Sequence, residues 1–237
     1  MSDPLQQNST LRTATTYDVG LRAFFGRVYN TMTAGLVITG LVAWLTVQSG
    51  LVVTIASNPI LAIIVALAPL GFLFFGFSPK NIWQKSAAQV NLMFYAFSAV
   101  FGLSLSYILL AYSGESIARV FFVTAGMFAG TSIYGYTTKR DLTGLGGLLA
   151  MGVIGLLIAM VVNIFWHSST LNFTISVLGV LIYTGLVAWD TQNLKEMYSS
   201  SANSEATNKS ATMGALSLYI NFLNLFMFLL RLMGDRR

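Results

Sequence analysis

The sequence predicts an all-α integral membrane protein, built as a bundle of seven transmembrane helices. Of its 237 residues, 55% are hydrophobic and only 9% are charged, whereas roughly a quarter of the residues are charged in soluble domains. The polar side chains are too few to cover the surface of a water-soluble protein, whereas a surface that faces lipid does not need them. The composition therefore excludes a soluble enzyme, and we expect the lipid bilayer to surround the protein.

Seven apolar runs divide the chain. A hydrocarbon core about 30 Å thick needs about 20 apolar residues per helix, and runs of that length lie at residues 28–50, 59–79, 88–112, 117–136, 144–165, 170–191 and 213–233. Most of the breaks contain Ser, Gly, Asn or Pro, which favour turns. We expect one transmembrane domain over residues 28–233 after a polar segment at 1–27 without signal-peptide features. The stretch 192–212 is predicted to be a flexible loop around residues 199–203.

The cations between the runs predict the orientation. Lys and Arg occur in the N-terminal segment and in the breaks at 80–85, 139–140 and 195–209, whereas residues 49–58 and the His167 turn have neither. The positive-inside rule then places the N-terminus in the cytoplasm. Seven spans leave the C-terminus outside, although Arg231, Arg236 and Arg237 cluster there. A last segment that enters and returns would suit these charges better, but its apolar run is long enough to cross.

The net charge of +5 would suggest nucleic acid for a soluble protein. Here the cations lie between apolar runs, where they orient the chain. We therefore expect no nucleic-acid partner.

Small residues recur at helical spacing in several runs, as in Gly126 and Gly130. Such pairs allow helices to approach closely in lipid. Packing is therefore favoured over a pore-lining role for these stripes.

The last run has the most polar face, with Gly214, Ser217, Asn221, Asn224 and Arg231 spaced by three, four or seven residues. Two amides on one face are costly in lipid unless they are paired. We therefore expect this helix to be central and to be wrapped by the other six.

Asp190 is the one acid within an apolar run, on the face that carries Tyr183. An intramembrane carboxylate is by default a functional candidate, although the sixth helix could instead end there and leave Asp190 at the interface. If that helix continues to Tyr198, Asp190 and Asn221 lie at about the same depth, roughly 12 Å from the helix ends. An acid facing an amide could switch with its proton, because the ionised form would attract a cation or water.

The sequence lacks the residues and motifs that membrane-enzyme active sites usually contain. The chain has no Cys and one His, and neither an HExxH nor a GxSxG motif is present. His167 lies beside Trp166, where an interfacial anchor is favoured over a catalytic base. The Lys139, Arg140 and Asp141 turn is interpreted as solvated rather than as a gate or partner contact. We expect no enzyme, no catalytic residue, no cofactor and no certain metal site.

Four stretches resemble motifs of the Bax inhibitor (TMBIM) family, over a match from about residue 22 to residue 234. They are the opening pattern Arg22, Phe25, Val28-Tyr29, Met32 and Gly35-Leu36, the turn at 134–142 (YGYTTKRDL), residues 189–192 (WDTQ), and residues 215–226 (ALSLYINFLNLF). These motifs most resemble those of bacterial members. The resemblance therefore implies that the protein is located in the plasma membrane, which is the inner membrane in bacteria.

The resemblance implies a bundle with the seventh helix surrounded by the other six, and a pH-sensitive calcium leak. In that leak two acids, on helices 6 and 7, share a proton. The first acid maps onto Asp190 and the second onto Asn221, where this chain has an amide in place of the commoner Asp. One carboxylate and one amide cannot split their titration as two carboxylates do. The amide also adds no charge for calcium, so we expect weaker binding.

We therefore expect a calcium or cation leak channel or sensor, with Asp190 and Asn221 as ion gate and pH sensor. Ser217, Asn224, Tyr183, Arg140 and Asp141 are the predicted supporting residues. The alternative is a non-conducting regulator that binds other membrane proteins, in cell-death or protease regulation. A small-solute transporter ranks last, because only a loose repeat of helices is visible.

Overall fold

The computed structural model describes residues 4–198 and 203–236, with side chains from residue 19 onward. Every regular element in these ranges is a helix: α1 (Pro4–Gln48), α2 (Leu51–Ser57), α3 (Pro59–Gly76), α4 (Pro79–Gln84), α5 (Ala87–Leu105), α6 (Ile108–Ala111), α7 (Gly114–Thr137), α8 (Thr143–Trp166), α9 (Ser169–Met197) and α10 (Ser204–Met233). Seven stretches of helix in this part of the chain are long and apolar enough to cross a membrane. The predicted all-α architecture with seven spans is confirmed.

The helices begin where the sequence offers caps. Asn58 accepts hydrogen bonds from the backbone amides of Ile60 and Leu61, and Pro59 occupies the first position of α3, where no amide partner is needed. Ser86 and Gln89 form a reciprocal capping box at the start of α5. The breaks predicted from turn residues are therefore real helix starts.

Two predicted boundaries are corrected by the structure. The flexible loop expected at 192–212 is much shorter, because α9 continues to Met197 and α10 begins at Ser204; residues 199–202 of its core lie outside the described residues. The run predicted from residue 28 is part of a longer continuous helix, α1, which begins well before it. In both cases hydropathy marks only the apolar part of a helix, whereas its polar turns extend beyond the hydrocarbon.

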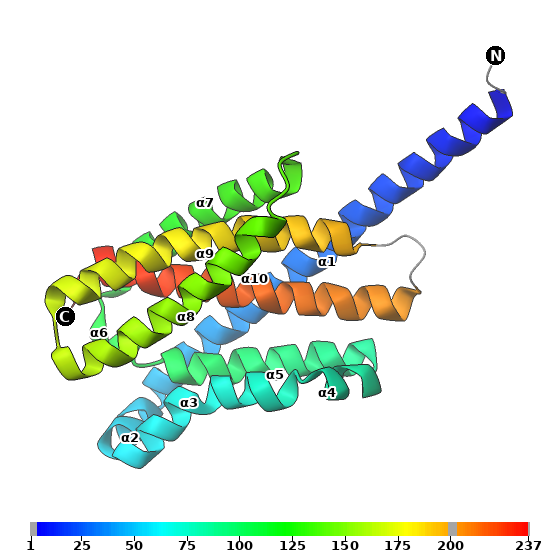
Figure 1. Cartoon of the computed structure of the whole chain (residues 1–237). Coiled ribbons are helices and arrows are strands. Elements are labelled where there is room, and N and C mark those ends of the chain that lie inside the picture. Colours follow the sequence, from blue (N-terminus) through cyan, green and yellow to red (C-terminus); the bar gives the residue numbers. More distant parts are fainter. Residues whose placement is uncertain (1–3, 199–202, 237) are drawn as a thin grey trace.

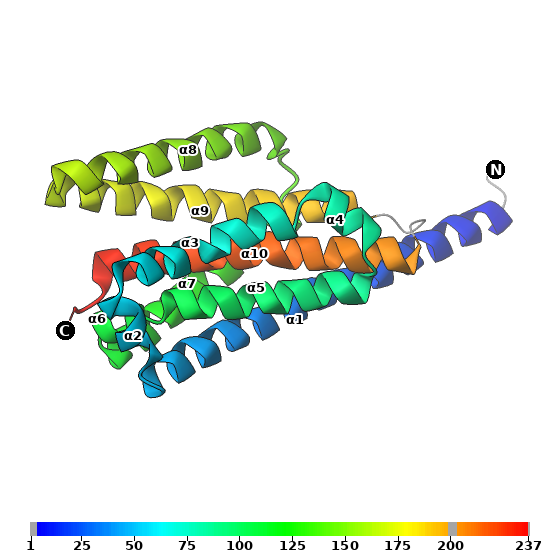
Figure 2. The same cartoon turned by 90° about the horizontal axis from the view of Figure 1, so that it is seen from below.

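Helix α10 lies between α9 and α5 in both views of the bundle (Figures 1 and 2). It packs against α9, α1, α7 and α5, whereas α3 packs mainly on α5 and α8 mainly on α9. In its most apolar window 72% of the residues are buried, compared with 6% in α3 and α8. The last helix is thus the innermost one, but the expected wrapping by all six others is corrected: it packs mainly on four helices, and α3 and α8 lie farther out because they pack on α5 and α9.

Tyr219 is the central side chain of the core and is fully buried. Its ring meets those of Phe94, Phe97 and Phe101 edge to face at 5.4–6.0 Å between centroids. Its hydroxyl lies 2.5 Å from Oγ1 of Thr39 on α1. This arrangement joins α1, α5 and α10 through one aromatic cluster with a satisfied hydroxyl.

The packing role predicted for Gly126 and Gly130 is wrong. Both are exposed on α7, and a Cβ added at either would meet nothing within 4 Å. The buried face of α7 instead ends in Gly135, where a Cβ would collide with the backbone carbonyl of Ala188 on α9. A small-residue pair shows where helices can approach closely, but only the packing decides which face is used.

Candidate functional site

Asp190 lies on α9 and is 7% exposed. Every other acid whose side chain the structure describes is exposed. Helix α9 does not end at Asp190 but continues for two more turns to Met197, so the acid is not a terminal interfacial residue. Its position within a long apolar helix requires partners from neighbouring helices.

Helix α10 provides those partners. Ser217 Oγ donates a hydrogen bond of 2.6 Å to Asp190 Oδ2, and Asn221 Nδ2 donates one of 2.5 Å to the same oxygen. The donors are four residues apart, so they lie one turn apart on one face of α10. The structure therefore brings together Asp190, Ser217 and Asn221.

The electrostatics of this site are unusual because no counter-ion is present. The ion pairs of the described residues are Arg119 with Asp235 and Lys209 with Glu205, and neither includes Asp190. Burial opposes ionisation of a carboxylate, whereas two donated hydrogen bonds favour it. The two donors on α10 therefore offset part of the cost of burying an ionised carboxylate here.

A second polar chain begins at the next residue of α9. Thr191 Oγ1 lies 2.9 Å from Ser132 Oγ on α7, and Ser132 Oγ lies 2.6 Å from the Tyr29 hydroxyl on α1. Tyr29 and Ser132 also line a largely apolar groove of about 630 Å³ between α1 and α7. Hydroxyl groups thus connect this groove to the residue that follows Asp190.

Gln192 anchors the turn between α7 and α8. Its side-chain oxygen accepts a hydrogen bond of 2.7 Å from the amide of Leu142, and its nitrogen donates one of 2.8 Å to the carbonyl of Arg140. Lys195 Nζ donates to the carbonyl of Tyr136, at 2.9 Å, and lies 5.1 Å from the centre of that ring. Three successive residues of α9 (190–192) therefore contact α10, α7 and the turn before α8.

Four of the predicted supporting residues lie away from the acid. Asn224 donates to the carbonyl of Ile220 on its own helix, and the Tyr183 ring lies 5.7 Å from that of Phe228. Arg140 and Asp141 are exposed. The Thr143 hydroxyl and backbone amide hold the pKa of Asp141 below its ordinary value. The turn is joined to α9 next to the acid through Gln192.

Sequence reasoning missed Tyr29, Ser132, Thr191, Gln192 and Lys195 as candidate site residues. Thr191 and Gln192 stand directly after Asp190 in residues 189–192, so their position beside the acid was the available signal. Nothing in the sequence pairs Ser132 with Thr191, because hydroxyl residues are common in membrane helices and their partners depend on packing.

Comparisons with known proteins agree with this architecture. The family model described as "Inhibitor of apoptosis-promoting Bax1" matches residues 21–237. A Caulobacter vibrioides protein is 45% identical over 93% of this chain and 91% of its own length. The protein RP147 of Rickettsia prowazekii is 42% identical over 94% of this chain and 93% of its own.

A third relative has a name that refers to its location. The Escherichia coli inner membrane protein YbhL is 40% identical over 92% of this chain and 94% of its own length. The family match covers all seven apolar helices, and the relatives match nearly from end to end. This multi-pass membrane protein therefore belongs to the Bax inhibitor family.

Proposed function

We propose that this protein is a pH-sensitive cation leak channel of the bacterial inner membrane, with calcium as the ion and Asp190 as the gate. The observation that carries the proposal is a buried carboxylate with two hydrogen-bond donors and no ion-pair partner among the described residues. Ionisable groups inside a membrane bundle mark ion or proton pathways. The name of the E. coli relative supports the location.

The side chains at the site suit a hard cation. Calcium prefers oxygen ligands. Asp190 and Ser217 provide side-chain oxygens at the cluster, and Asn221 would provide a third if its amide turned its oxygen, in place of its nitrogen, toward the ion. Only one of these oxygens belongs to a charged group, so the site would attract the ion weakly. Weak binding suits conduction, in which the ion must leave as readily as it enters.

Whether the gate attracts cations depends on the protonation of Asp190. Above the titration of Asp190 the carboxylate is ionised, accepts both hydrogen bonds and attracts cations. Below it the neutral acid has no charge to attract calcium and forms a polar contact between α9 and α10 instead. Calcium flux should therefore fall as the pH is lowered through this titration.

The matched pair Asp190→Asn and Glu196→Gln tests the proposal. Each variant replaces one acid of α9 by its amide, but Glu196 is exposed and lies outside the site. Calcium flux into liposomes that contain only this protein is measured at stepped pH from 5 to 8. We expect Asp190→Asn to abolish the pH response and Glu196→Gln to retain it, with thermal unfolding showing that both variants fold.

The rival function is a non-conducting regulator of other membrane proteins. The observation that favours it is the N-terminal part of α1, whose helix extends beyond the rest of the bundle (Figure 1). A regulator predicts no calcium flux at any pH in liposomes. That result would replace the channel proposal, and a normal pH response in Asp190→Asn would remove Asp190 from the gate.

A further inference from the structure

The C-terminal segment is fastened to the start of α7. The backbone amide of Asp235 donates to Ser116 Oγ at 2.9 Å, and the Asp235 carbonyl accepts from the amide of Ser113 at 3.2 Å. Arg119 forms an ion pair of 2.5 Å with the Asp235 carboxylate. These contacts place Arg236 in a backbone bridge with Tyr112, so its position follows from the fold.

Two cations at this end of the bundle have no acidic partner. Arg231 and Arg236 are both exposed, and neither is in an ion pair with another of the described residues. Each guanidinium instead lies over an aromatic ring, Arg231 at 5.6 Å from the centre of Phe228 and Arg236 at 5.9 Å from that of Tyr112. Such contacts position the cations but leave their charge available.

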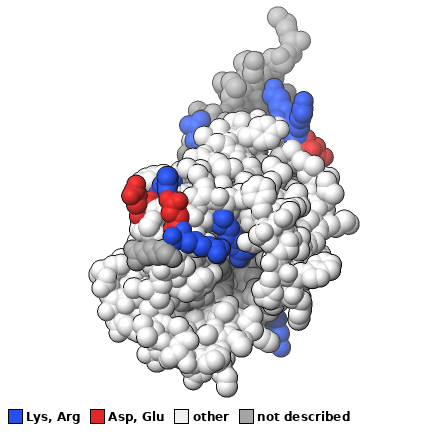
Figure 3. Space-filling model, turned by 90° about the vertical axis from the view of Figure 1, so that its left-hand side faces the viewer, with Lys and Arg blue, Asp and Glu red and all other residues white. Residues whose placement is uncertain are grey.

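Both guanidinium groups line the same two hollows. One, of about 410 Å³, lies between α8, α9 and the end of α10 and includes Asn163 and Asn172. The other, of about 270 Å³, is bounded by α6 and α10 and includes Tyr107. Figure 3 looks onto this end and shows basic side chains near its centre, with acidic side chains beside them, on an otherwise uncharged face. Each guanidinium group presents several N–H donors in one plane. Two such groups beside one hollow suit an anion with several oxygens.

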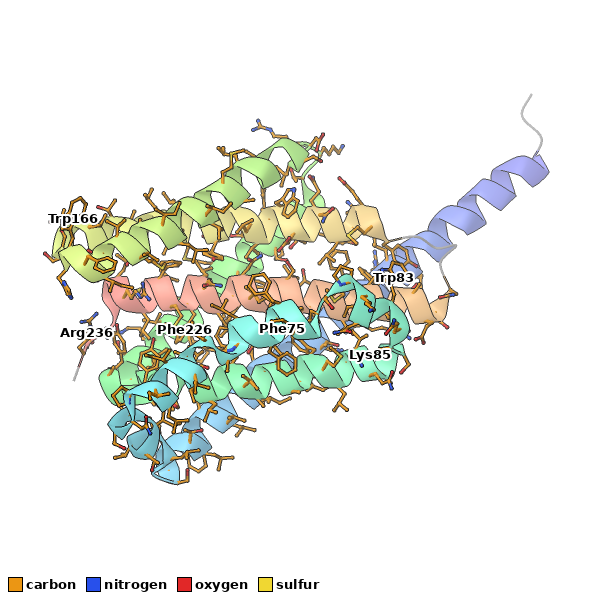
Figure 4. All side chains as sticks on the ribbon, turned by 60° about the horizontal axis from the view of Figure 1, so that its bottom comes forward. Phe75, Trp83, Lys85, Trp166, Phe226 and Arg236 are labelled. Atoms are coloured by element: carbon orange, nitrogen blue, oxygen red, sulfur yellow. The ribbon has the colours of Figure 1, made fainter. Side chains whose placement is uncertain are left out.

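Exposed aromatic residues beside the larger hollow indicate that it lies at the level of a membrane interface. Trp166 and Phe165 at the end of α8 are 75% and 80% exposed, and exposed aromatic residues mark the level of lipid headgroups. Trp166 and Arg236 lie at the same end of the molecule, opposite Trp83 and Lys85 (Figure 4). Met160, Ile164 and Ile175 line the hollow beside the cations, so an apolar chain and a charged group could be bound together.

We propose that Arg231 and Arg236 form a binding site for a phosphate group at the C-terminal end of the bundle. The phosphodiester of an anionic phospholipid is the source that the interfacial depth and the apolar wall favour. Free phosphate is the other source with the same chemistry. The proposal does not depend on ion conduction, because the site lies at the opposite end of α10 from Asn203, beyond the Asp190 cluster.

The test compares lipid phosphate with free phosphate as the ligand, and it compares a double Arg variant with a double Lys variant as control. Thermal unfolding of the purified protein in a neutral detergent is followed while phosphatidylglycerol, phosphatidylcholine or inorganic phosphate is added at matched ionic strength. The variant is Arg231→Gln with Arg236→Gln. Its control is Lys80→Gln with Lys139→Gln, which removes two exposed cations from the other end of the bundle.

We expect phosphatidylglycerol to stabilise the natural protein and the control more than phosphatidylcholine does. Its affinity should fall at least tenfold in the double Arg variant, which corresponds to about 1.4 kcal/mol. Arg231→Lys should weaken it less, because Lys keeps the charge without the fork of donors.

Stabilisation by inorganic phosphate that also requires both Arg residues would support the site with free phosphate as its source. An equal response to the two lipids in the natural protein, with no response to phosphate, would overturn the proposal. The same conclusion follows if the double Arg variant and its control respond alike. The comparison of the two lipids uses the natural protein. It therefore tests the proposal even if the double Arg variant does not fold.

Discussion

Asp190 and Asn221 form a pair in which only the acid titrates. Their 2.5 Å hydrogen bond joins two buried polar residues, one on α9 and one on α10. An amide can donate to an ionised carboxylate or accept from a neutral one, so the contact between the helices survives protonation. What changes with the proton is the charge.

A second acid at this position should change how the site titrates. In Asn221→Asp two carboxylates would lie within hydrogen-bonding distance and share a proton, so their titration separates into two steps. We expect the pH profile of calcium flux to broaden and calcium to bind more tightly, since the ionised pair has two charges. Each unit of pK separation corresponds to about 1.4 kcal/mol. Flux in liposomes at stepped pH measures the profile.

The swapped variant, Asp190→Asn with Asn221→Asp, is the control for this prediction. It keeps one acid and one amide but exchanges their helices, so a single protonation step should return. If Asn221→Asp keeps the single step of the natural protein, the two positions are not coupled and the pair does not form the gate.

Gln192 shows how one side chain can position a whole turn. Its amide satisfies both a donor and an acceptor of the backbone at residues 140–142. In Gln192→Glu the oxygen that replaces the amide nitrogen would face the carbonyl of Arg140. A buried acceptor without a donor costs about 1–3 kcal/mol. We expect lower thermal stability and faster hydrogen exchange at residues 139–142.

Glu196→Gln, an exposed change one turn along α9, is the matched control and should leave this exchange unchanged. Slow exchange at the turn in Gln192→Glu would mean that other contacts hold it.

At the scale of helices, contact between α7 and α9 depends on a missing side chain. The backbone carbonyl of Ala188 lies where a Cβ of residue 135 would be. Two helices that approach this closely cannot accept a methyl group without moving apart. The polar links from Ser132 to Thr191 and from Lys195 to Tyr136 lie along this same contact.

Gly135→Ala and Gly126→Ala form a matched pair on one helix. Gly135→Ala should destabilise the protein by about 1–3 kcal/mol, because the added methyl overfills the contact. Gly126→Ala adds a methyl group where nothing lies within 4 Å and should be neutral or stabilising by about 0.5–1 kcal/mol, since Ala favours helix. Thermal unfolding in detergent compares them, and equal effects of the two changes would refute the assignment of the packed face.

At the scale of the whole molecule, charge differs between the two ends of the bundle. Lys85 lies at the end opposite Arg236 and Trp166 (Figure 4). Helix α10 is also one continuous helix of 30 residues, long and apolar enough to cross a membrane, rather than a segment that returns. Arg231 and Arg236 therefore lie at the end opposite Lys85, and the proposed phosphate site would explain why these cations occur there.

The orientation can be tested with single cysteines, since the chain contains none. Thr143→Cys places a thiol at the end of the turn that carries Lys139 and Arg140, and Ser57→Cys places one at the exposed end of α2, in the cation-free stretch 49–58. With the N-terminus in the cytoplasm, an impermeant maleimide added to intact cells should label Ser57→Cys and not Thr143→Cys. The reverse pattern would invert the topology, and both variants should react after the membrane is permeabilised.

The sequence by itself determined the seven helices and their class, because the length and hydropathy of a run are local properties. It also placed Asp190 and Asn221 at one depth, because the rise per residue of a helix is constant. It did not determine that Gly135 rather than Gly126 packs, that Gln192 binds a turn 50 residues away, or that Arg231 and Arg236 line shared hollows. Helical periodicity defines the faces of each helix, but which neighbour covers a face depends on the packing of all seven, and only the tertiary structure decided that.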